Sequence, residues 1–209
     1  MIYIIITTCL INKYGVKDDI HRQNRYTDSI RQILKLVEND LSIKPIIVEN
    51  NGLRQTFLDD FKCDVIYTNN NNNIPFRYKG KCEYKGLIEL LDIKEVINRY
   101  KIHDDDIIIK LTGRYKLLNL NFINLVKTGS NDAFVKFFNV CTKKYEFYDC
   151  VLGLFAIKCK YLKSFNYQLI KSPEVEFAEY IRKNINKITE IKYLYLECCF
   201  ADDLRILYV

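Results

Sequence analysis

The fold of this chain is decided by one stretch, Ile107-Ile108-Ile109-Lys110-Leu111-Thr112-Gly113-Arg114-Tyr115, in which an apolar run ends abruptly in polar residues. Apolar runs rich in β-branched residues are typical of strands that are buried on both faces of a parallel sheet. Ligands of open α/β sheets bind beyond the carboxyl ends of such strands. The polar end, Thr112 to Tyr115, is therefore predicted to face a ligand.

The residues that precede this strand predict more of the same sheet. Ile2–Thr8 and Ile43–Val48 are two further apolar runs, and Asp64–Tyr67 is a shorter one. Between the first two, apolar residues recur at helical spacing from Ile30 to Val37. Glu49–Gly52 is a strong turn signal directly after a strand. The resulting β-α-β-β order is typical of a nucleotide-binding half-domain.

The rest of the chain continues this alternation without an internal repeat or a linker. We predict helices over 86–100, 121–127 and 173–184, and strands over 133–138, 151–157 and 194–196. The predicted fold is a single α/β domain of residues 1–209, with a mostly parallel central sheet flanked by helices. Residues 1–115 would form about the nucleotide-binding half, and residues 116–209 the acceptor half.

The bulk composition excludes several classes of protein. Hydrophobic residues make up 49% of the chain and charged residues 28%, as in folded soluble proteins. The net charge of +6 is scattered, whereas nucleic-acid binding usually leaves a clustered basic footprint. No apolar stretch approaches the ~18 residues of a membrane span, and the N-terminus lacks the features of a secretory signal. We expect a cytoplasmic protein with no nucleic-acid partner and no membrane span.

Cysteine and histidine usage argues against a zinc site. The 8 cysteines include no CxxC pair, and the 2 histidines, His21 and His103, are far from any of them in sequence. Several cysteines, among them Cys9 and Cys150, lie inside apolar runs. We expect free thiols in a reducing compartment.

Four residues at the end of the decisive strand have the chemistry of a diphosphate clamp. Alternation places Lys110 and Thr112 on one face of the strand end. Gly113 permits a close approach of the backbone, and the guanidinium of Arg114 presents a planar fork of donors to phosphate oxygens. The alternative is a surface lysine and arginine that pair with nearby aspartates, because exposed ion pairs are common and weak.

Two other strand ends offer polar groups to the same crevice. Thr7 and Thr8 end the first strand, while Glu49 and Asn50 follow the second. A carboxylate there can accept hydrogen bonds from a ribose diol or a base N–H. For the residues after the second strand, a turn that uses Asn and Gly only for its backbone conformation is the alternative.

The helix over 86–100 contributes a weaker signal. Lys85 stands at its N-terminus and reinforces the attraction of a helix start for anions. Glu89, one turn later, is predicted to point inward or toward the ligand.

Carboxylates suited to acid–base work lie in the C-terminal half. The candidates are Asp149, Glu174, Glu176 and the Asp202-Asp203 pair, of which we favour Asp149 and Glu176 as a general base. Asp104–Asp106 precede their strand, so they are predicted at the opposite edge of the sheet in a solvated loop. The run Asn69–Asn73 is predicted to be a flexible, low-complexity bridge without a site.

At these motifs the chain resembles, nearly end to end, the small GT-A-type glycosyltransferases of giant DNA viruses of the mimivirus and chlorella-virus kind, with related bacterial sequences. The specific element is Lys110-Leu111-Thr112-Gly113-Arg114-Tyr115. Looser elements are Ile2–Thr8, Ile46–Gly52, Lys85–Glu89, Asp149–Ala156 and Ser172–Phe177.

The resemblance implies a Rossmann-like GT-A fold and the transfer of a hexose from a nucleoside-diphosphate sugar, UDP-linked, to a saccharide or other hydroxyl acceptor in viral glycan synthesis. It implies that Thr7, Thr8 and Glu49 hold the nucleoside and that Lys85 and Glu89 flank the donor. The strand Gly153–Ala156 would line the acceptor side, with Glu176 nearby.

The resemblance fails at one position. Most GT-A enzymes end the fourth strand in an Asp-x-Asp motif that binds a divalent metal on the diphosphate, whereas this chain has Thr112-Gly113-Arg114. The sequence therefore requires no metal, although manganese or magnesium stays open. Lys110 and Arg114 are predicted to neutralise the leaving diphosphate in its place.

Two alternatives remain at this stage. A sugar nucleotidyltransferase has a similar sheet but usually carries a glycine-rich loop after the first strand, where this chain has Thr7-Thr8-Cys9-Leu10. A non-catalytic glycan- or nucleic-acid-binding module fits the basic charge and the 13% of aromatic residues.

Overall fold

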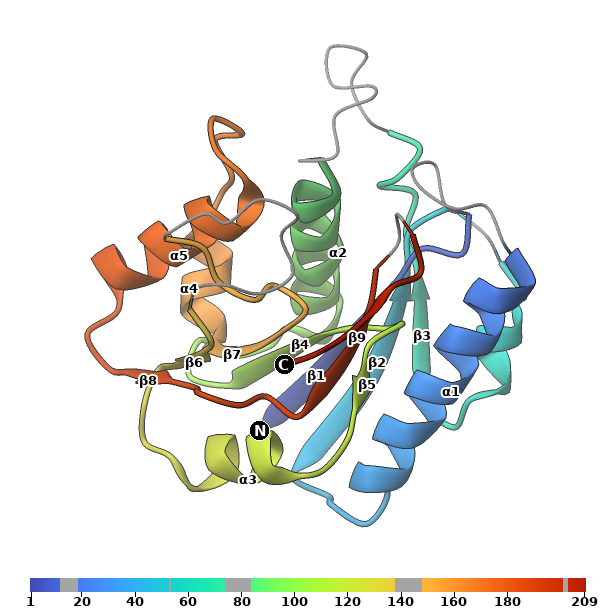
Figure 1. Ribbon diagram of the computed structural model, residues 1–209, viewed down its shortest axis with the longest axis horizontal. Coiled ribbons are helices and arrows are strands. Elements are labelled where there is room, and N and C mark those ends of the chain that lie inside the picture. The colour runs from blue at the N-terminus through green and yellow to red at the C-terminus, as the bar shows by residue number, and fades with distance from the viewer. Residues whose placement is uncertain (12–18, 53, 74–83, 138–147, 201–202) are drawn as a thin grey trace.

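A seven-stranded sheet forms the centre of the molecule, with the strand order β3-β2-β1-β4-β7-β6-β8 (Figure 1). The computed structural model describes residues 1–11, 19–52, 54–73, 84–137, 148–200 and 203–209. The strands are β1 Ile2–Thr8, β2 Ile43–Glu49, β3 Asp64–Tyr67, β4 Ile107–Thr112, β6 Ala133–Val135, β7 Leu154–Lys158 and β8 Ile188–Glu190. Only β7 runs antiparallel to its neighbours β4 and β6. The prediction of a mostly parallel central sheet is confirmed.

Helices cover both faces of this sheet, which explains why its inner strands are apolar on both sides. On one face, α1 (Asp19–Val37) and α3 (Asn121–Thr128) contribute to one core cluster. On the other face, α2 (Tyr84–Tyr100), α4 (Cys159–Ser164) and α5 (Pro173–Asn184) contribute to a second. Each large apolar side chain that is fully buried stabilises such a core by about 1.5–3 kcal/mol.

A small antiparallel sheet lies beside the first core. Its order is β10-β9-β5, with β5 at Lys116–Leu117, β9 at Leu196–Cys199 and β10 at Ile206–Tyr208. A short 3-10 helix, Phe57–Asp60, precedes β3. Through the small sheet, β9 brings the Cys199 carbonyl against Arg114, which follows β4.

The elements predicted in the C-terminal half are present, with shifted bounds. The predicted strand 151–157 is β7 at 154–158, and the strand predicted at 194–196 is β9 at 196–199. The strand predicted at 133–138 ends at Val135, and beyond it Phe137 forms an isolated bridge with Cys150. β5, β8 and β10 escaped prediction because strands of two or three residues have no periodicity of their own and depend on their pairing partners.

The central sheet does not divide at residue 115 into the two halves that the sequence suggested. β7, β6 and β8 come from the C-terminal part yet extend the sheet directly from β4. The two proposed halves therefore share one sheet, and the assignment of donor and acceptor to them stays a prediction. Within the described ranges, none of the helices has the length and apolar character needed to cross a membrane.

Candidate functional site

The carboxyl ends of β1, β2 and β4 meet at one edge of the sheet. The strand register places Thr7 beside Thr112 and Thr8 beside Glu49. Directly after β4, the Gly113 amide donates to the Thr7 carbonyl at 2.8 Å. A Cβ atom at Gly113 would lie 2.9 Å from the Thr8 methyl group and 3.0 Å from the Thr7 carbonyl oxygen. The glycine of the Thr112-Gly113-Arg114 motif is thus required by the close approach of β1.

Glu49 organises the loop that follows β1. Its side chain is fully buried, and its carboxylate accepts the Thr8 hydroxyl at 2.7 Å and the Leu10 amide at 3.1 and 3.2 Å. The backbone amide and the side-chain amide of Asn51 donate to the same carboxylate, at 3.2 and 2.5 Å. These donors occupy both oxygens, so Glu49 shapes the crevice in this arrangement. Its direct contact with a nucleoside stays a prediction.

Asn50 belongs to a buried cluster around Asp92, a residue of α2 that the sequence reasoning missed. Asp92 accepts hydrogen bonds from Asn50 at 3.0 Å, from Thr68 at 2.7 Å and from Asn70 at 2.7 Å. Burial raises the pKa of Asp92 to about 7, against the lowering effect of these three donors. The Oδ1 atom of Asn50 is buried and, within the described part of the chain, has no hydrogen-bond partner.

The asparagine run is part of this framework, so the prediction that Asn69–Asn73 is a flexible bridge is wrong, while the prediction that it carries no site stays a prediction. Asn71 is 4% exposed and donates to the Asn51 side chain at 2.6 Å. Asn72 donates to the Asn51 carbonyl at 2.8 Å. Asparagine carries both donors and acceptors on a short side chain, which lets a run of them hold two neighbouring loops together.

Lys110 lies at the centre of a second buried network. Its ammonium group lies 2.7 Å from the Glu89 carboxylate, and it donates to the Thr112 hydroxyl at 2.6 Å and to the Leu152 carbonyl at 2.8 Å. Glu89 also accepts the Thr7 hydroxyl at 3.1 Å. Burial lowers the pKa of Lys110, and the charge of Glu89 opposes this shift. Three acceptors match the three N–H groups of an ammonium, so Lys110 neutralises Glu89 here. The alternative of an exposed pair with a nearby aspartate is wrong, while a contact with phosphate stays a prediction.

Arg114 leaves the end of β4 toward α1. Its Nε donates to the Cys199 carbonyl at 2.8 Å, and its guanidinium interacts with the Tyr26 hydroxyl. Arg22, in the first turn of α1, reaches the same place from the other side. Its Nε and Nη2 donate to the Cys9 carbonyl at 3.3 and 2.8 Å, and Nη2 contacts the Tyr26 hydroxyl at 3.4 Å. No local pattern singles out Arg22, because only the packing of α1 brings it to this edge.

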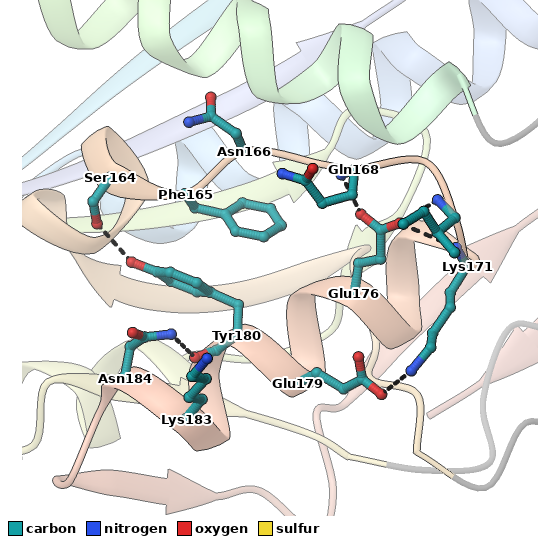
Figure 2. A pocket seen from close by; sticks show the side chains of 11 residues that line it. Ser164, Phe165, Asn166, Gln168, Lys171, Glu176, Glu179, Tyr180, Lys183 and Asn184 are labelled. Carbon is teal, nitrogen blue, oxygen red and sulfur yellow. Dashed lines mark hydrogen bonds and ion pairs between the residues drawn. The ribbon is translucent and has the colours of Figure 1, made fainter.

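Glu176 lies on the wall of a cleft of about 410 Å³ between α5 and the segment that precedes it (Figure 2). Its carboxylate accepts the backbone amides of Gln168 at 2.6 Å, Ile170 at 2.7 Å and Lys171 at 3.0 Å. Burial opposes the effect, but these backbone donors hold the pKa of Glu176 below its ordinary value. A lowered pKa weakens a general base, so the geometry favours a role in holding this segment.

The other predicted residues are placed as follows. Asp149 is fully buried, so in this arrangement its carboxylate cannot reach the hydroxyl group of an acceptor substrate. Lys85 is half-buried in the first turn of α2, the same helix that carries Glu89. Asp202 lies outside the described residues, and Asp203 is exposed. The catalytic roles predicted for Asp149 and Glu176 stay predictions.

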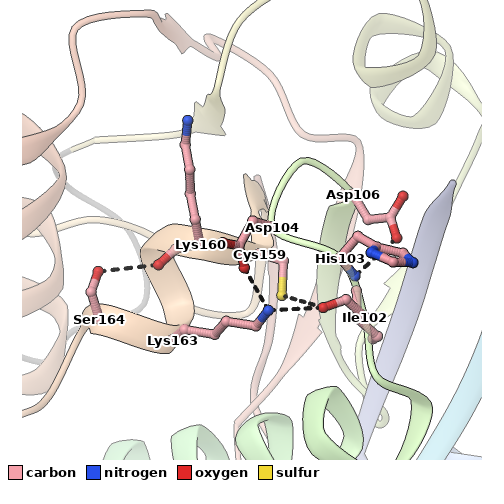
Figure 3. A network of polar contacts seen from close by, with 8 residues as sticks. All are labelled: Ile102, His103, Asp104, Asp106, Cys159, Lys160, Lys163 and Ser164. Carbon is pink, nitrogen blue, oxygen red and sulfur yellow. Dashed lines mark hydrogen bonds and ion pairs between the residues drawn. The ribbon is translucent and has the colours of Figure 1, made fainter.

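The acidic run 104–106 lies at the opposite edge of the sheet, as predicted. Asp104 pairs with Lys163 at 2.5 Å, and the same ammonium donates to the Ile102 carbonyl at 2.9 Å (Figure 3). Asp106 pairs with the N-terminal ammonium of Met1 at 2.9 Å. These partners make the run part of the frame at the far end of the strands.

The end of β4 does not have the donor set of a divalent metal site. Hard divalent cations prefer several carboxylate or carbonyl oxygens, whereas Lys110 and Arg114 bring two positive charges. The carboxylate nearest to Lys110, Glu89, already faces its ammonium. Among the residues that the structure describes, no group of three or more His, Cys, Asp or Glu side chains is arranged to hold a metal ion.

Comparison with known proteins supports the fold. No family model and no curated protein matches the sequence. A protein from Desulfovibrio desulfuricans G20, assigned as a nucleotide-diphospho-sugar transferase, superposes with a TM-score of 0.55 at 7% identity, over 91% of this chain and 79% of that one. CMP:2-keto-3-deoxy-manno-octonic acid synthetase in complex with CTP gives 0.53 at 11% identity, over 91% and 89%. Residues 1–349 of S. aureus TarS give 0.53 at 12% identity, over 91% and 57%. The chain has a GT-A-like fold.

Proposed function

We propose that this chain transfers a sugar from a nucleoside-diphosphate sugar, of the uridine series, to a hydroxyl group of a saccharide acceptor. In this reaction the bond between the anomeric carbon and the diphosphate oxygen breaks, and the acceptor oxygen bonds to the anomeric carbon. The acceptor proton passes to a base, and the nucleoside diphosphate leaves with the bonding electrons. The protein must therefore hold a nucleoside and stabilise negative charge on the leaving group.

The observation that carries the proposal is the unpartnered Oδ1 of Asn50. Asn50 is 3% exposed and directly follows Glu49 at the end of β2, on the edge where ligands of open α/β sheets bind. A buried acceptor without a partner costs about 1–3 kcal/mol, and a base N–H would satisfy it. Its Nδ2 is held by Asp92, which fixes the direction of the free oxygen.

The proteins of similar fold support a function that involves a nucleotide, without specifying the sugar or the acceptor. One is assigned as a nucleotide-diphospho-sugar transferase and another was solved with CTP, so both belong to proteins that handle nucleotides. A second candidate function follows from the latter, because a synthetase of this kind is a nucleotidyltransferase. The absence of glycine from Thr7-Thr8-Cys9-Leu10 argues for sugar transfer instead.

Thermal-shift measurements against UDP-, GDP- and CMP-sugars test the proposal first. We expect stabilisation by a UDP-sugar and, in turnover assays, release of UDP in the presence of a saccharide acceptor. Release of pyrophosphate from a nucleoside triphosphate and a sugar phosphate would establish the second candidate. Stabilisation only by polymeric glycans or nucleic acids would overturn both and indicate a binding module.

The role of Asn50 is tested by Asn50→Ala, with Asn98→Ala as a matched control. Asn98 is exposed on α2, away from the carboxyl edge. We expect Asn50→Ala to weaken the binding of uridine and UDP about 10-fold, because one hydrogen bond to the base is lost. Equal weakening by both variants would remove the support that Asn50 gives to a nucleoside site.

A further inference from the structure

Arg22 has a buried guanidinium whose hydrogen-bonding capacity is incompletely used. The residue is 4% exposed, and its Nε and Nη2 atoms donate to the Cys9 carbonyl and contact the Tyr26 hydroxyl. Its Nη1 is buried and has no hydrogen-bond partner among the residues that the structure describes. Because an arginine is always charged, an unsatisfied N–H at this depth is costly unless a ligand occupies it.

No carboxylate neutralises this charge within the described part of the chain. Arg22 and Arg114 form no ion pair there, whereas Arg25, on the same helix, pairs with Glu197 at 2.5 Å. Glu49 influences Tyr26 electrostatically, but its oxygens accept hydrogen bonds from Thr8 and Leu10 and form no ion pair with either described guanidinium. A buried guanidinium without a counter-charge is destabilising. Among the described residues, neither guanidinium between α1 and the end of β4 is therefore paired with an anion.

Tyr26 brings the two guanidinium groups together. It is 1% exposed, and its hydroxyl interacts with both Arg22 and Arg114. The Arg22 guanidinium also lies over the Tyr26 ring, 5.5 Å from its centroid. A neutral phenol between two cations orients them without cancelling their charge.

The chemistry of the pair selects phosphate oxygens. Guanidinium groups bind phosphate through parallel N–H bonds, and two of them can hold adjacent phosphoryl groups. Arg22 also stands in the first turn of a 19-residue helix, whose N-terminus favours anions. A carboxylate ligand would use only one of the two forks.

We propose that Arg22 and Arg114, held by Tyr26, form a binding site for a diphosphate group. The identity of the natural ligand, the diphosphate of the sugar donor, rests on the proposed function. This site differs from the diphosphate clamp predicted from the sequence, which paired Arg114 with Lys110. Here the partner of Arg114 is Arg22 on α1. Lys110 serves instead to neutralise Glu89.

Calorimetric titration with inorganic pyrophosphate, inorganic phosphate, UDP and uridine tests the site. We expect Arg22→Gln and Arg114→Gln each to weaken pyrophosphate and UDP binding about 10-fold or more, as for a lost charged hydrogen bond. Uridine binding should be unchanged. The matched control is Arg31→Gln, an exposed arginine on the same helix, which should bind pyrophosphate like the unaltered protein.

Three results would overturn the site: no binding of pyrophosphate or UDP by the unaltered protein, unchanged binding in both arginine variants, or equal weakening in Arg31→Gln. If Arg22→Gln does not fold, pyrophosphate binding is measured in Arg114→Gln and in Arg22→Lys, which keeps the charge but loses the guanidinium. Unchanged binding in both would overturn the site.

The site and the proposed function can fail separately. Arginine-dependent pyrophosphate binding without turnover of any nucleotide sugar would establish the site and reject sugar transfer. Sugar transfer that is indifferent to Arg22 and Arg114 would establish the reverse.

Discussion

The ammonium group of Lys110 lies 2.7 Å from the carboxylate of Glu89, and the lysine side chain is only 2% exposed. The two residues belong to β4 and α2, so the pair joins a strand of the central sheet to the helix that covers one of its faces. Thr7 of β1 and Thr112 complete the network. The polar end of β4 therefore depends on a helix that precedes it in the chain.

Replacing Lys110 by methionine should destabilise the fold. Lys110→Met leaves the Glu89 carboxylate without its counter-charge in a partly buried place, and we expect the free energy of unfolding to fall by about 3 kcal/mol. Urea denaturation measures this. The control is Lys127→Met, which breaks the more exposed pair with Asp40 and should cost about 1 kcal/mol or less. Equal losses in the two variants would contradict the network.

Asp92 should make stability depend on pH. Burial raises its pKa from 3.8 to about 7. The folded protein thus keeps a proton that the unfolded chain releases, so this contribution is fully present below about pH 4 and is lost as the pH rises through 7. Asp92→Asn removes the titration. The stability difference between the two proteins should change across this window by on the order of 3 kcal/mol, and parallel pH profiles would refute the assignment.

Adding a methyl group at Gly113 should disturb the junction of β1 and β4. In Gly113→Ala the new Cβ would meet the Thr7 carbonyl at 3.0 Å and the Thr8 methyl at 2.9 Å, which forces a backbone shift. We expect a loss of about 1–3 kcal/mol in the free energy of unfolding and weaker pyrophosphate binding through displaced Arg114. Ser130→Ala, at an exposed position, is the control. An unchanged melting temperature would show that the junction of β1 and β4 accommodates a Cβ atom at position 113 without strain.

Glu176→Gln should loosen the segment before α5. A glutamine side chain has one oxygen where the carboxylate accepts three backbone amides with two, so we expect a loss of about 1 kcal/mol and a lower melting temperature. Glu190→Gln, at an exposed position outside this segment, controls for the lost charge. The predicted role of Asp149 or Glu176 as general base is checked in the same series with Asp149→Asn. Transfer should fall by about 100-fold or more in the variant of the base while donor binding persists, and undiminished transfer in both would remove both candidates.

Chelation should leave sugar transfer intact. The end of β4 offers Lys110, Thr112 and Arg114, and the charges of its two basic residues oppose a divalent cation. We expect turnover with EDTA to equal turnover without it. Complete loss in EDTA, restored by manganese, would show that metal neutralises the leaving diphosphate.

The fold could be predicted from the sequence, and so could the meeting of polar residues at one edge of the sheet, where the candidate site lies. Apolar runs such as Ile2–Thr8 and Ile107–Leu111 report burial on both faces of a strand, and helical spacing reports one buried face. These patterns are local, so they can be interpreted without knowing which distant residues each segment contacts. The rule that ligands lie beyond the carboxyl ends of strands then selected Thr7, Thr8, Glu49 and Thr112, which the strand register brings together.

Only the tertiary structure decided what the polar residues at this edge contact. Arg22 and Asp92 lie on helices, and nothing in their local sequence shows that α1 and α2 turn them toward the strand ends. The pairing of Lys110 with Glu89 requires the packing of α2 against the sheet, and the hydrogen bonds of Asn71 require two loops to meet. Contacts of this kind join residues far apart in the chain, and their partners are set by strand register and helix packing, which no local periodicity encodes.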